Sequence, residues 1–454
     1  MNDAPDAQHP AAGAGALPSA SGPLHARVVV PGSKSIANRA LVAACLAPPG
    51  SVLRGVPTGD DVDAMCEALV ALGARFEVAD AADAPGAPEV AGGDVRVAAG
   101  VALEDGRAVR VDARLAGTTS RFVAAVAALR VGPTTVDGAE RLRSRPARDL
   151  HDALAALGAS VRRPGPGDLP VTVQRGSLRL DAREALRVAV PGGASSQFTS
   201  ALLLAGAACS GGIHVTVLGS TVSDEYVALT ASVLGAFGVR VDATAQGWSA
   251  RGALRPAEVW VEPDASSATF AWCAAAVAGG RVDVAGLGRT SAQADVRVVE
   301  VLARMGCVIH EDSGLGVSRD PARRLAGVDV DLGATSDAVP AIAAVAAYAS
   351  GATRIRGVAH VRTKESDRIA DVVAMLRAVG VEATATTDGL EVRPGAGTPR
   401  GGVIATRRDH RLAMAAGVLA TCTQGVCVDD PGVVTKSWPG HWAARSAWLV
   451  PGTR

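Results

Sequence analysis

The fold of this chain is decided by the stretch Ala201-Leu-Leu-Leu-Ala-Gly-Ala-Ala-Cys-Ser-Gly-Gly212, which leads directly into Ile213-His-Val-Thr-Val217. The first part is rich in Ala and Leu, as a buried helix is, and the second has the β-branched composition of a short strand. Gly212 stands at the junction, where glycine can adopt the left-handed conformation that ends a helix. The stretch therefore predicts a helix, a glycine cap and a strand in direct succession.

The same succession occurs six times along the chain. The other copies are Leu41–Gly50 with Ser51–Arg54, Val123–Gly132 with Pro133–Val136, Ala271–Gly280 with Arg281–Val284, Ile342–Gly351 with Ala352–Ile355, and Leu412–Gly425 with Val426–Val428. A second helix–glycine–strand element lies between them, for example at Ala68–Gly73 and Met375–Gly380. The repeat is too long for a solenoid and indicates βαβ-type units packed into α/β domains. Six units predict two similar domains of three units each; the alternative is an ordinary α/β chain whose helices end at glycine.

Composition excludes several classes of function. The 454 residues are 48% hydrophobic and 20% charged with zero formal net charge, a globular composition that is long enough for two domains. Zero net charge and only 3% aromatic residues argue against nucleic acid as a partner. Because no apolar run reaches the ~20 residues of a membrane span, we expect no membrane-spanning segment.

The N-terminal residues and the cysteines indicate the cytoplasm. Residues 1–22 are rich in Ala, Pro, Gly and Ser and contain no Lys or Arg, so we expect a disordered tail rather than a signal or transit peptide. The seven cysteines include no Cys-x-x-Cys pair and the histidines include no His-x-x-x-His pair, so no metal site is expected. An odd number of cysteines without a pairing pattern suits a reducing compartment, which predicts a cytoplasmic protein.

Several expected helix starts carry hydroxyl groups and cations that suit an anionic ligand. The candidate residues are Lys34, Ser35 and Arg39; Gly117 to Arg121; Arg145; and Ser195, Ser196 and Gln197. Free N–H groups at a helix start bind phosphate or carboxylate, and Lys and Arg add positive charge. The turn Gly32-Ser-Lys34 lacks the glycine that a Walker loop has directly before its lysine, which excludes an ordinary P-loop. Plain helix capping is the alternative for each start alone; together they indicate sites for a multiply anionic ligand.

Carboxylates among cations form a second group of candidates. Lys364-Glu-Ser-Asp-Arg368 places two cations and two carboxylates within five residues, and Asp409-His-Arg411 follows. If the first stretch is helical, Lys364 and Arg368 share a face. Neighbouring Glu and Lys can tune each other's pKa, as acid–base catalysis requires. Asp337 opens a further apolar helix. A solvated helix face and an N-cap aspartate are the alternatives.

Eight motifs, in this order, resemble the 5-enolpyruvylshikimate-3-phosphate synthase family of enolpyruvyl transferases. The resemblance runs from about Ala26 to Trp442. The motifs are Pro31-Gly-Ser-Lys-Ser35 with Asn38-Arg39, Ala116-Gly-Thr118 with Arg121, Arg145-Pro146, Ser195-Ser-Gln-Phe198, Asp337-Ala338, Lys364-Glu-Ser-Asp-Arg368, Asp409-His-Arg411, and Lys436-Ser-Trp-Pro439. One short match would be unspecific, whereas eight in order are specific.

The resemblance implies an α/β fold of two similar domains. Each would hold three βαβαββ repeats in an inside-out α/β barrel, and two crossings of the chain would join them. One domain would comprise residues 33–262, and the other residues 23–32 together with 263–454. The domains would close over the substrates.

The activity implied is transfer of the carboxyvinyl group of phosphoenolpyruvate to the 5-hydroxyl of shikimate 3-phosphate, through a tetrahedral intermediate and with release of phosphate. Both small-molecule partners carry a phosphate and a carboxylate, which accounts for the many Arg and Lys residues. The resemblance implies no cofactor, and we expect a monomer.

Matching motif positions imply a role for each residue. Asp337 would be the base for the 5-hydroxyl and Glu365 the proton donor, with Lys34 assisting. Shikimate 3-phosphate would be bound by Lys34, Ser35, Arg39, Ser195, Ser196, Gln197, Ser223, Tyr226, Asp337 and Lys364, and phosphoenolpyruvate by Lys34, Gly117, Arg145, Gln197, Arg368, Arg411 and Lys436.

Three positions depart from the family pattern. Leu115 stands where the family usually has Asn, so one donor toward the phosphoenolpyruvate phosphate would be missing. His360 stands where some members have Asn, and Arg407-Arg408 is unusually basic. Gly117 is retained, which implies a pocket open to the inhibitor glyphosate. Leu115 and His360 motivate the alternative of a paralogous carboxyvinyl transferase with a different hydroxyl acceptor.

Two further alternatives are opposed by particular residues. The related enzyme that acts on UDP-N-acetylglucosamine generally uses a loop cysteine, and Val111–Arg148 contains none. A non-catalytic phosphate binder would not need Asp337, Glu365 and Lys34 together.

Overall fold

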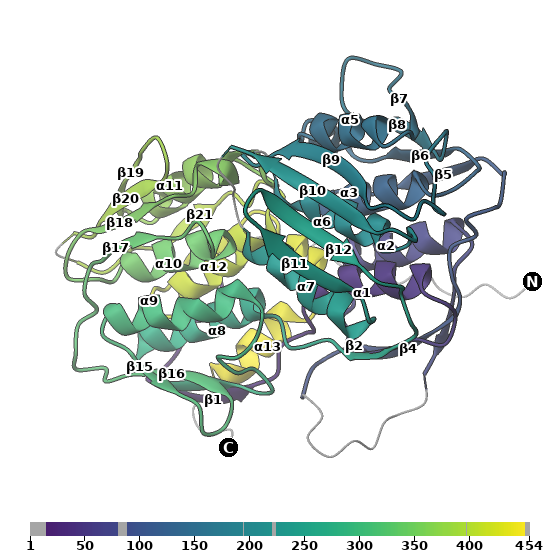
Figure 1. Ribbon diagram of the computed structural model, residues 1–454. Coiled ribbons are helices and arrows are strands. Elements are labelled where there is room, and N and C mark those ends of the chain that lie inside the picture. Colours follow the sequence, from purple (N-terminus) through teal and green to yellow (C-terminus); the bar gives the residue numbers. More distant parts are fainter. Residues whose placement is uncertain (1–14, 80–88, 194, 220–223, 396, 450–454) are drawn as a thin grey trace, which may run out of the picture.

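The computed structural model of the protein describes residues 15–79, 89–193, 195–219, 224–395 and 397–449, and these form two lobes (Figure 1). The buried apolar residues fall into two clusters. One takes its members from residues 36–261, and we call the part around it the N-lobe. The other takes its members from residues 24–30 and 265–449, and we call that part the C-lobe.

Three four-stranded sheets build the N-lobe. In each sheet the first two strands are parallel and the other pairings are antiparallel. In sheet order they are β13 (Glu258–Trp260), β2 (Val52–Val56), β4 (Gly93–Ala99), β3 (Arg75–Val78); β5 (Val109–Asp112), β6 (Thr134–Asp137), β8 (Val171–Gln174), β7 (Ser160–Arg162); and β9 (Leu186–Pro191), β10 (Ile213–Leu218), β12 (Gly247–Arg251), β11 (Arg240–Thr244). The helices are α1 (Lys34–Leu46), α2 (Asp60–Ala71), α3 (Gly117–Ala127), α4 (Glu140–Arg143), α5 (Arg148–Ala156), α6 (Ser196–Gly206) and α7 (Glu225–Ala236).

The C-lobe repeats this plan in two complete sheets and one short one. The sheets are β1 (Leu24–Val28), β14 (Gly280–Val284), β16 (Leu315–Arg319), β15 (Val308–His310); β17 (Asp329–Asp331), β18 (Thr353–Arg356), β20 (Leu390–Arg393), β19 (Glu382–Ala385); and β21 (Gly402–Ile404) with β22 (Val426–Val428). The helices are α8 (Ala265–Ala278), η1 (Ala294–Arg297), α9 (Val298–Arg304), η2 (Ser336–Ala338), α10 (Val339–Ala346), η3 (Ala359–Thr363), α11 (Arg368–Ala378), α12 (His410–Ala420), η4 (Pro431–Lys436) and α13 (His441–Trp448).

The predicted α/β fold of βαβαββ units is confirmed, with one correction. A complete unit runs along the chain as β5–α3–β6–α5–β7–β8, with the short α4 inserted before α5. In the sixth unit, as far as the described residues go, only β21, α12 and β22 follow this plan, and η4 and α13 come next. The last copy is therefore shorter than the repeat predicted for it.

The left-handed conformation predicted for the six cap glycines occurs at four of them. Left-handed backbone occurs, as predicted, at Gly50, Gly212, Gly280 and Gly425. Gly132 and Gly351 do not have positive φ. At Gly132 an added Cβ would lie 2.4 Å from a backbone oxygen, so this position needs glycine for space rather than for its dihedral freedom.

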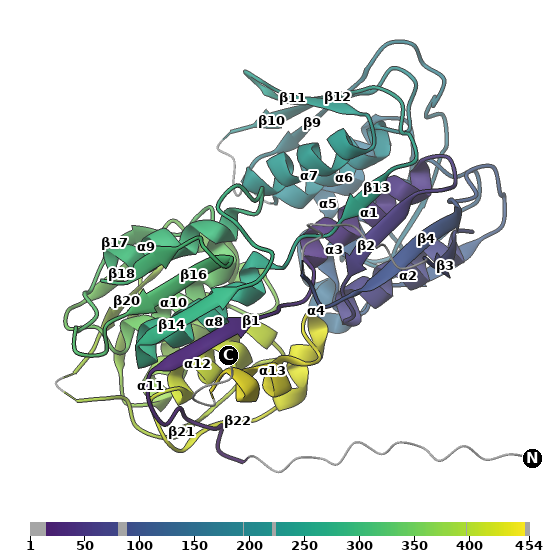
Figure 2. The same ribbon diagram turned by 90° about the horizontal axis from the view of Figure 1, so that it is seen from below.

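The inner helices explain the inside-out arrangement. Every residue of α12 is buried, and α1, α3, α6, α8 and α10 are buried along most of their length. A helix buried all round must lie in a core rather than cover one. Figure 2 shows α1, α3 and α6 among the sheets of the N-lobe.

The chain passes between the lobes twice, and the two passages lie side by side. The Ser33 amide donates to the Glu262 carbonyl at 2.7 Å, and the Asp264 amide donates to the Pro31 carbonyl at 2.8 Å. The predicted domain boundaries near residues 32 and 262 stay a prediction, which the division of the buried residues into two clusters supports.

The predicted disordered tail over residues 1–22 was too long. Residues 1–14 lie outside the described part of the chain. The Leu17 amide donates to Val426 at 2.8 Å and the Ala20 amide to Thr421 at 2.9 Å, so residues 15–22 run along the C-lobe. Because these bonds join backbone groups, the amino-acid composition of residues 15–22 could not predict them.

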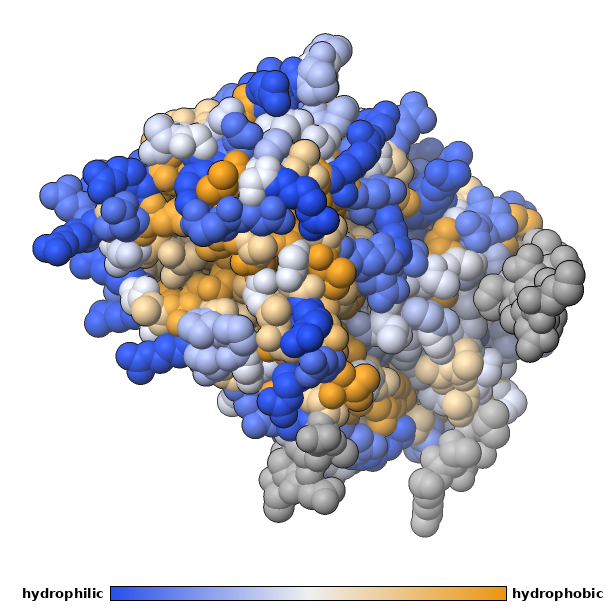
Figure 3. All heavy atoms as spheres, turned by 90° about the vertical axis from the view of Figure 1, so that its right-hand side faces the viewer, coloured by the Kyte–Doolittle hydropathy of each residue, from blue (hydrophilic) through white to orange (hydrophobic). Residues whose placement is uncertain are grey.

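No described helix is long and apolar enough to cross a membrane. On the face shown in Figure 3, hydrophilic side chains surround a central area of hydrophobic ones.

Candidate active site

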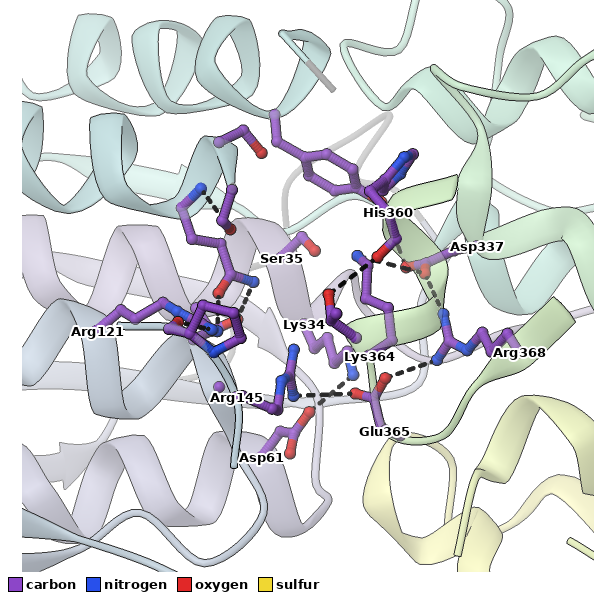
Figure 4. A pocket seen from close by; sticks show the side chains of 18 of the residues that line it. Lys34, Ser35, Asp61, Arg121, Arg145, Asp337, His360, Lys364, Glu365 and Arg368 are labelled. Carbon is purple, nitrogen blue, oxygen red and sulfur yellow. Dashed lines mark hydrogen bonds and ion pairs between the residues drawn. The ribbon is translucent and has the colours of Figure 1, made fainter. Parts of the chain in front are cut away.

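A cavity lies between the lobes, and both lobes line it (Figure 4). Its lining residues are Lys34, Ser35, Arg39, Asp61, Gly117, Thr118, Arg121, Arg145, Pro146, Ser195, Ser196, Gln197 and Tyr226 from the N-lobe, and Asp337, His360, Thr363, Lys364, Glu365, Arg368 and Arg411 from the C-lobe. The structure thus brings most of the predicted site residues to one place. Their individual roles stay predictions.

Helix starts position the N-lobe residues. Lys34 begins α1, Gly117 begins α3 and Ser196 begins α6, so three positive helix ends face the cavity. Ser195 caps α6 by accepting the Gln197 amide at 3.3 Å, which is the capping role that the sequence left open as the alternative. An added Cβ at Gly117 would lie 2.6 to 2.8 Å from atoms of the Arg121 and Arg145 guanidinium groups. Glycine therefore lets two cations lie over the start of α3.

The C-lobe side chains come from the starts of α10, α11 and α12. Asp337 lies in η2 just before α10, and Arg411 lies in the first turn of α12, whose cap is Asp409. If residues 364–368 were helical, Lys364 and Arg368 would share a face. They do not lie in one helix, because η3 ends at Thr363, a bend covers residues 364–366, and α11 begins only at Arg368.

Asp337 is held by cations of its own lobe. Arg368 Nη1 donates to Oδ1 at 2.6 Å, Arg411 Nη2 to Oδ2 at 2.8 Å, and the Tyr226 hydroxyl to Oδ2 at 3.3 Å. Lys364 Nζ lies 4.0 Å from Oδ1. Burial alone would raise the pKa of Asp337, but Arg411, Lys364 and Arg368 outweigh it and hold that pKa well below its usual value.

Arg368 bridges three carboxylates. Besides Asp337, its Nε donates to Asp409 Oδ2 at 2.7 Å and its Nη2 to Glu365 Oε2 at 2.8 Å. Glu365 also lies 3.7 Å from Arg145 Nη1, across the cleft. Burial would raise the pKa of Glu365, yet Arg368 and Arg145 outweigh it and hold that pKa well below its usual value. Glu365 is therefore ionised in this state of the site, although a proton donor must first be protonated.

Asp61 is a site residue that the sequence did not reveal. Its Oδ2 accepts from Lys34 Nζ at 2.7 Å and its Oδ1 from Lys436 Nζ at 2.5 Å, so it joins two predicted cations. Burial lowers the pKa of Lys34, but the attraction of Asp61 outweighs it and leaves that pKa raised. In the sequence Asp61 is one of three acidic residues in the first turn of α2, a common pattern that does not point to a site.

Two buried arginines of the N-lobe bond to neutral acceptors. Arg39 donates to Thr230 Oγ1 at 2.7 Å and to the Ser35 carbonyl at 2.8 Å. Arg121 donates to Gln197 Oε1 and to the Pro146 carbonyl, both at 2.7 Å. Arg121 was a candidate for an anionic ligand, but the family resemblance gave it no role toward either substrate. Its position beside Gln197 places it in the cavity.

Lys436 and Leu115 do not line the central cavity. Ser223 lies outside the described residues. Lys436 is buried beside the cavity and reaches it through Asp61; it also donates to the Leu115 carbonyl at 3.3 Å. The Leu115 side chain lines neighbouring grooves with Arg114, Arg408 and others.

The histidines of the site are neutral. Burial lowers the pKa of His360, which lines the cavity, to about 4. Burial also holds the pKa of His410 well below its usual value, and His410 lies fully buried at the start of α12. Two neighbours of the site residues have structural contacts: the Ser366 hydroxyl donates to Asp409 Oδ2 at 3.5 Å, and Asp367 caps α11 by accepting the Ala370 amide at 3.1 Å.

Curated relatives match nearly the whole chain. The 3-phosphoshikimate 1-carboxyvinyltransferase of Mycobacterium ulcerans is 38% identical over 434 residues, which cover 93% of this chain and 94% of that protein. The enzyme of the same name from Nostoc sp. is 34% identical over 449 residues, which cover 94% and 97%.

Solved structures share the fold. An EPSP synthase from Acinetobacter baumannii superposes with a TM-score of 0.75 at 24% identity, covering 95% of this chain and 97% of that one. An enolpyruvyl transferase from Streptomyces tendae superposes with a TM-score of 0.70 at 18% identity, covering 95% and 96%. At these identities the likeness concerns the fold alone.

A family model settles the relationship. The model described as EPSP synthase (3-phosphoshikimate 1-carboxyvinyltransferase) matches residues 18–444. It spans both lobes and every element that lines the cavity. The chain is therefore a member of the EPSP synthase family of transferases.

Proposed function

We propose that the protein transfers the carboxyvinyl group of phosphoenolpyruvate to the 5-hydroxyl of shikimate 3-phosphate and releases phosphate. The observation that carries this proposal is the cavity between the lobes, where Asp337 and Glu365 lie among cations from both sides. Two substrates that each carry a phosphate and a carboxylate need such a distribution of charge. Membership of the EPSP synthase family supplies the reaction.

The binding roles follow the two walls of the cavity. Shikimate 3-phosphate would meet the starts of α1 and α6 on the N-lobe, with Lys364 and Asp337 opposite. Phosphoenolpyruvate would lie between the start of α3 with Arg145 and the C-lobe arginines Arg368 and Arg411. Lys34 faces both substrates in this arrangement, and Lys436 acts beside it through Asp61.

The reaction needs proton transfers at carbon and at the 5-hydroxyl. Protonation of the methylene carbon of phosphoenolpyruvate makes its neighbouring carbon electrophilic, and the 5-hydroxyl attacks that carbon while losing its own proton. The tetrahedral intermediate then loses phosphate, and a proton leaves the new methyl group to restore the double bond. Asp337 would accept the proton of the hydroxyl, and Glu365 would exchange the proton at carbon.

Substrate binding would prepare both carboxylates. Arg368, Arg411 and Arg145 hold the pKa values of Asp337 and Glu365 low. When anionic groups of phosphoenolpyruvate bind these arginines, less positive charge remains for the carboxylates and their pKa values rise. Asp337 then becomes a stronger base and Glu365 can take up a proton, so a single binding event supports both roles.

We further propose a cytoplasmic monomer. One chain supplies both walls of the cavity, so the site needs no second subunit. All seven cysteines are free, as expected in a reducing compartment.

Phosphate release from phosphoenolpyruvate plus shikimate 3-phosphate tests the proposed reaction. Release that requires both substrates, and that Asp337→Ala abolishes, is the expected result. If shikimate 3-phosphate gives no release while another phosphorylated alcohol does, the paralogous transferase replaces this proposal. The curated relatives do not favour that alternative.

A further inference from the structure

Arg141 reaches across the cleft from the N-lobe to the backbone of the C-lobe. It lies in the short helix α4, just before Arg145. Its Nε donates to the Glu365 carbonyl at 2.9 Å, and its Nη2 lies 3.5 Å from the Lys364 carbonyl. Arg141 lines a groove beside the central cavity together with Arg145 and Glu365, two residues that also line the cavity itself.

The backbone that Arg141 contacts has little regular structure of its own. Lys364 follows η3 as its C-cap, and its amide donates to the Val361 carbonyl at a long 3.4 Å. A bend over residues 364–366 then precedes α11. Helix or sheet bonds do not fix the carbonyls of such a bend, so outside donors decide where its side chains lie.

Both side chains of this bend belong to the site. Glu365 lies between Arg145 and Arg368, and Lys364 lies 4.0 Å from Asp337 (Figure 4). A shift of the bend by about 1 Å would move both groups together, and displacements of that size can cost about 10²-fold in rate. Hydrogen bonds to the Lys364 and Glu365 carbonyls can therefore fix the position of both side chains.

We propose that Arg141 is a positioning residue that places Lys364 and Glu365 when the lobes are closed. The inference rests on the proposed function, because it assigns Arg141 to the same reaction. One guanidinium spans two successive carbonyls from the opposite lobe, so the bend takes its working position only when the N-lobe is in contact with it. Closure and the alignment of the acid–base groups are thereby linked through one side chain.

Arg143 offers a matched control on the same helix. Its Nε and Nη2 donate to the two carboxylate oxygens of Asp137 at 2.8 Å, entirely within the N-lobe. It has the same charge and lies two residues from Arg141, but within the described part of the chain its hydrogen bonds and ion pair stay inside the N-lobe. Comparing the two arginines separates the contact across the cleft from the general effect of removing a cation from α4.

The test measures steady-state phosphate release and the unfolding temperature for Arg141→Ala, Arg141→Lys and Arg143→Ala beside the unmodified protein. Arg141→Ala is expected to lower kcat by about 10- to 100-fold, to change the KM for phosphoenolpyruvate by less than about threefold, and to leave the unfolding temperature unchanged. Arg141→Lys should recover part of kcat, since an ammonium can still donate to one carbonyl. Arg143→Ala should stay within about twofold.

Three results would overturn the inference. They are a kcat for Arg141→Ala within about twofold of the unmodified protein, an equal loss in Arg143→Ala, and a loss that appears in KM alone. If Arg141→Ala does not fold, Arg141→Gln replaces it under the same criteria. Absence of phosphate release in the unmodified protein would instead refute the proposed function, so the two failures are distinguishable.

Discussion

The buried arginines on the two walls of the cavity have different partners: neutral oxygens on the N-lobe wall and carboxylates on the C-lobe wall. Among the described residues, no carboxylate forms an ion pair with Arg39 or Arg121 of the N-lobe, and both donate to neutral oxygens. Burial lowers the pKa of Arg39 to about 10, and burial with neighbouring Arg145 lowers the pKa of Arg121 to about 9. The N-lobe wall therefore holds positive charge that its own lobe does not neutralise.

The C-lobe wall neutralises its arginines internally. Arg368 bonds to Asp337, Glu365 and Asp409, and Arg411 bonds to Asp337. Burial would lower the pKa values of both, but the carboxylates outweigh it and raise them. An anionic ligand that approaches this wall must compete with the carboxylates already there.

The difference assigns separate tasks to the lobes. A wall with uncompensated cations gains most from an anionic ligand, because buried charge without a partner is unfavourable. A wall of paired charges instead holds groups whose protonation changes when a ligand rearranges the pairs. In the proposed arrangement the unpaired cations lie on the N-lobe wall and the proton-transfer groups on the C-lobe wall, so both serve one reaction only when the lobes meet.

The largest loss of activity is expected for a substitution in the C-lobe wall that leaves the N-lobe wall unchanged. Glu365→Gln keeps the shape of the side chain but removes the proton carrier, so kcat should fall by about 10²–10⁴-fold. The Kd for shikimate 3-phosphate, measured by calorimetry, should stay within about threefold, because Glu365 is not among the residues proposed to bind that ligand. Turnover close to that of the unmodified protein would contradict the role of Glu365.

A pair of matched substitutions tests the charge pairing itself. Arg368→Met leaves Asp409, which is fully buried, without its strongest partner, and should lower the free energy of unfolding by about 3–5 kcal/mol. Arg121→Met removes a cation that no carboxylate pairs with, and should cost about 1 kcal/mol or less. Urea unfolding of the two variants measures both values. Equal losses would show that the walls do not differ.

Asp295 gives a pH test of the C-lobe wall. Burial, with the nearby charge of Asp337, raises its pKa to about 6. Between about pH 4 and pH 6 the folded protein then keeps a proton that the unfolded chain has lost, so stability falls as pH rises through this window. Asp295→Asn should remove that contribution and gain about 2–3 kcal/mol at pH 7. Parallel pH–stability curves for the variant and the unmodified protein would contradict the shift.

The smallest expected effect concerns Leu115, at the edge of the N-lobe wall. Leu115→Asn retains the backbone carbonyl that accepts from Lys436 and adds an amide beside it. A hydrogen bond to the charged phosphate contributes about 1.5–3 kcal/mol, so the KM for phosphoenolpyruvate should fall by about ten- to 150-fold. Inhibition by glyphosate should strengthen in parallel. An unchanged KM would mean that the side chain at 115 does not reach the substrate.

The sequence predicted the repeated fold because its signals are local. A glycine after an Ala-rich helix and a β-branched run after that glycine, as in Ala201–Val217, depend only on neighbouring residues. The short sixth unit breaks the pattern after β22, where η4 and α13 replace the expected strands. That exception could not be foreseen from the regular copies.

The sequence predicted most residues of the site but not which of them form ion pairs with one another. Hydroxyl and basic residues at helix starts identified Lys34, Gly117 and Ser196 from local pattern and family resemblance. The contact of Asp61 with Lys436 joins residues 375 apart in the chain, and nothing near Asp61 indicates it. Tertiary contacts of this kind also decide that Glu365 is ionised, which no motif could show.

The two adjacent passages between the lobes have a consequence for how this chain could be rearranged. Strand β1 leads into the N-lobe, while α8, which completes the unit of β1 and β14, follows only after β13. The ends of the intervening segment already meet, with Ser33 and Glu262 2.7 Å apart between backbone atoms. The C-lobe is thus an interrupted barrel with a second barrel inserted at its first strand-to-helix connection. Joining Val30 to Asp264 would restore an uninterrupted C-lobe, and the excised segment would have neighbouring ends suited to cyclisation or circular permutation.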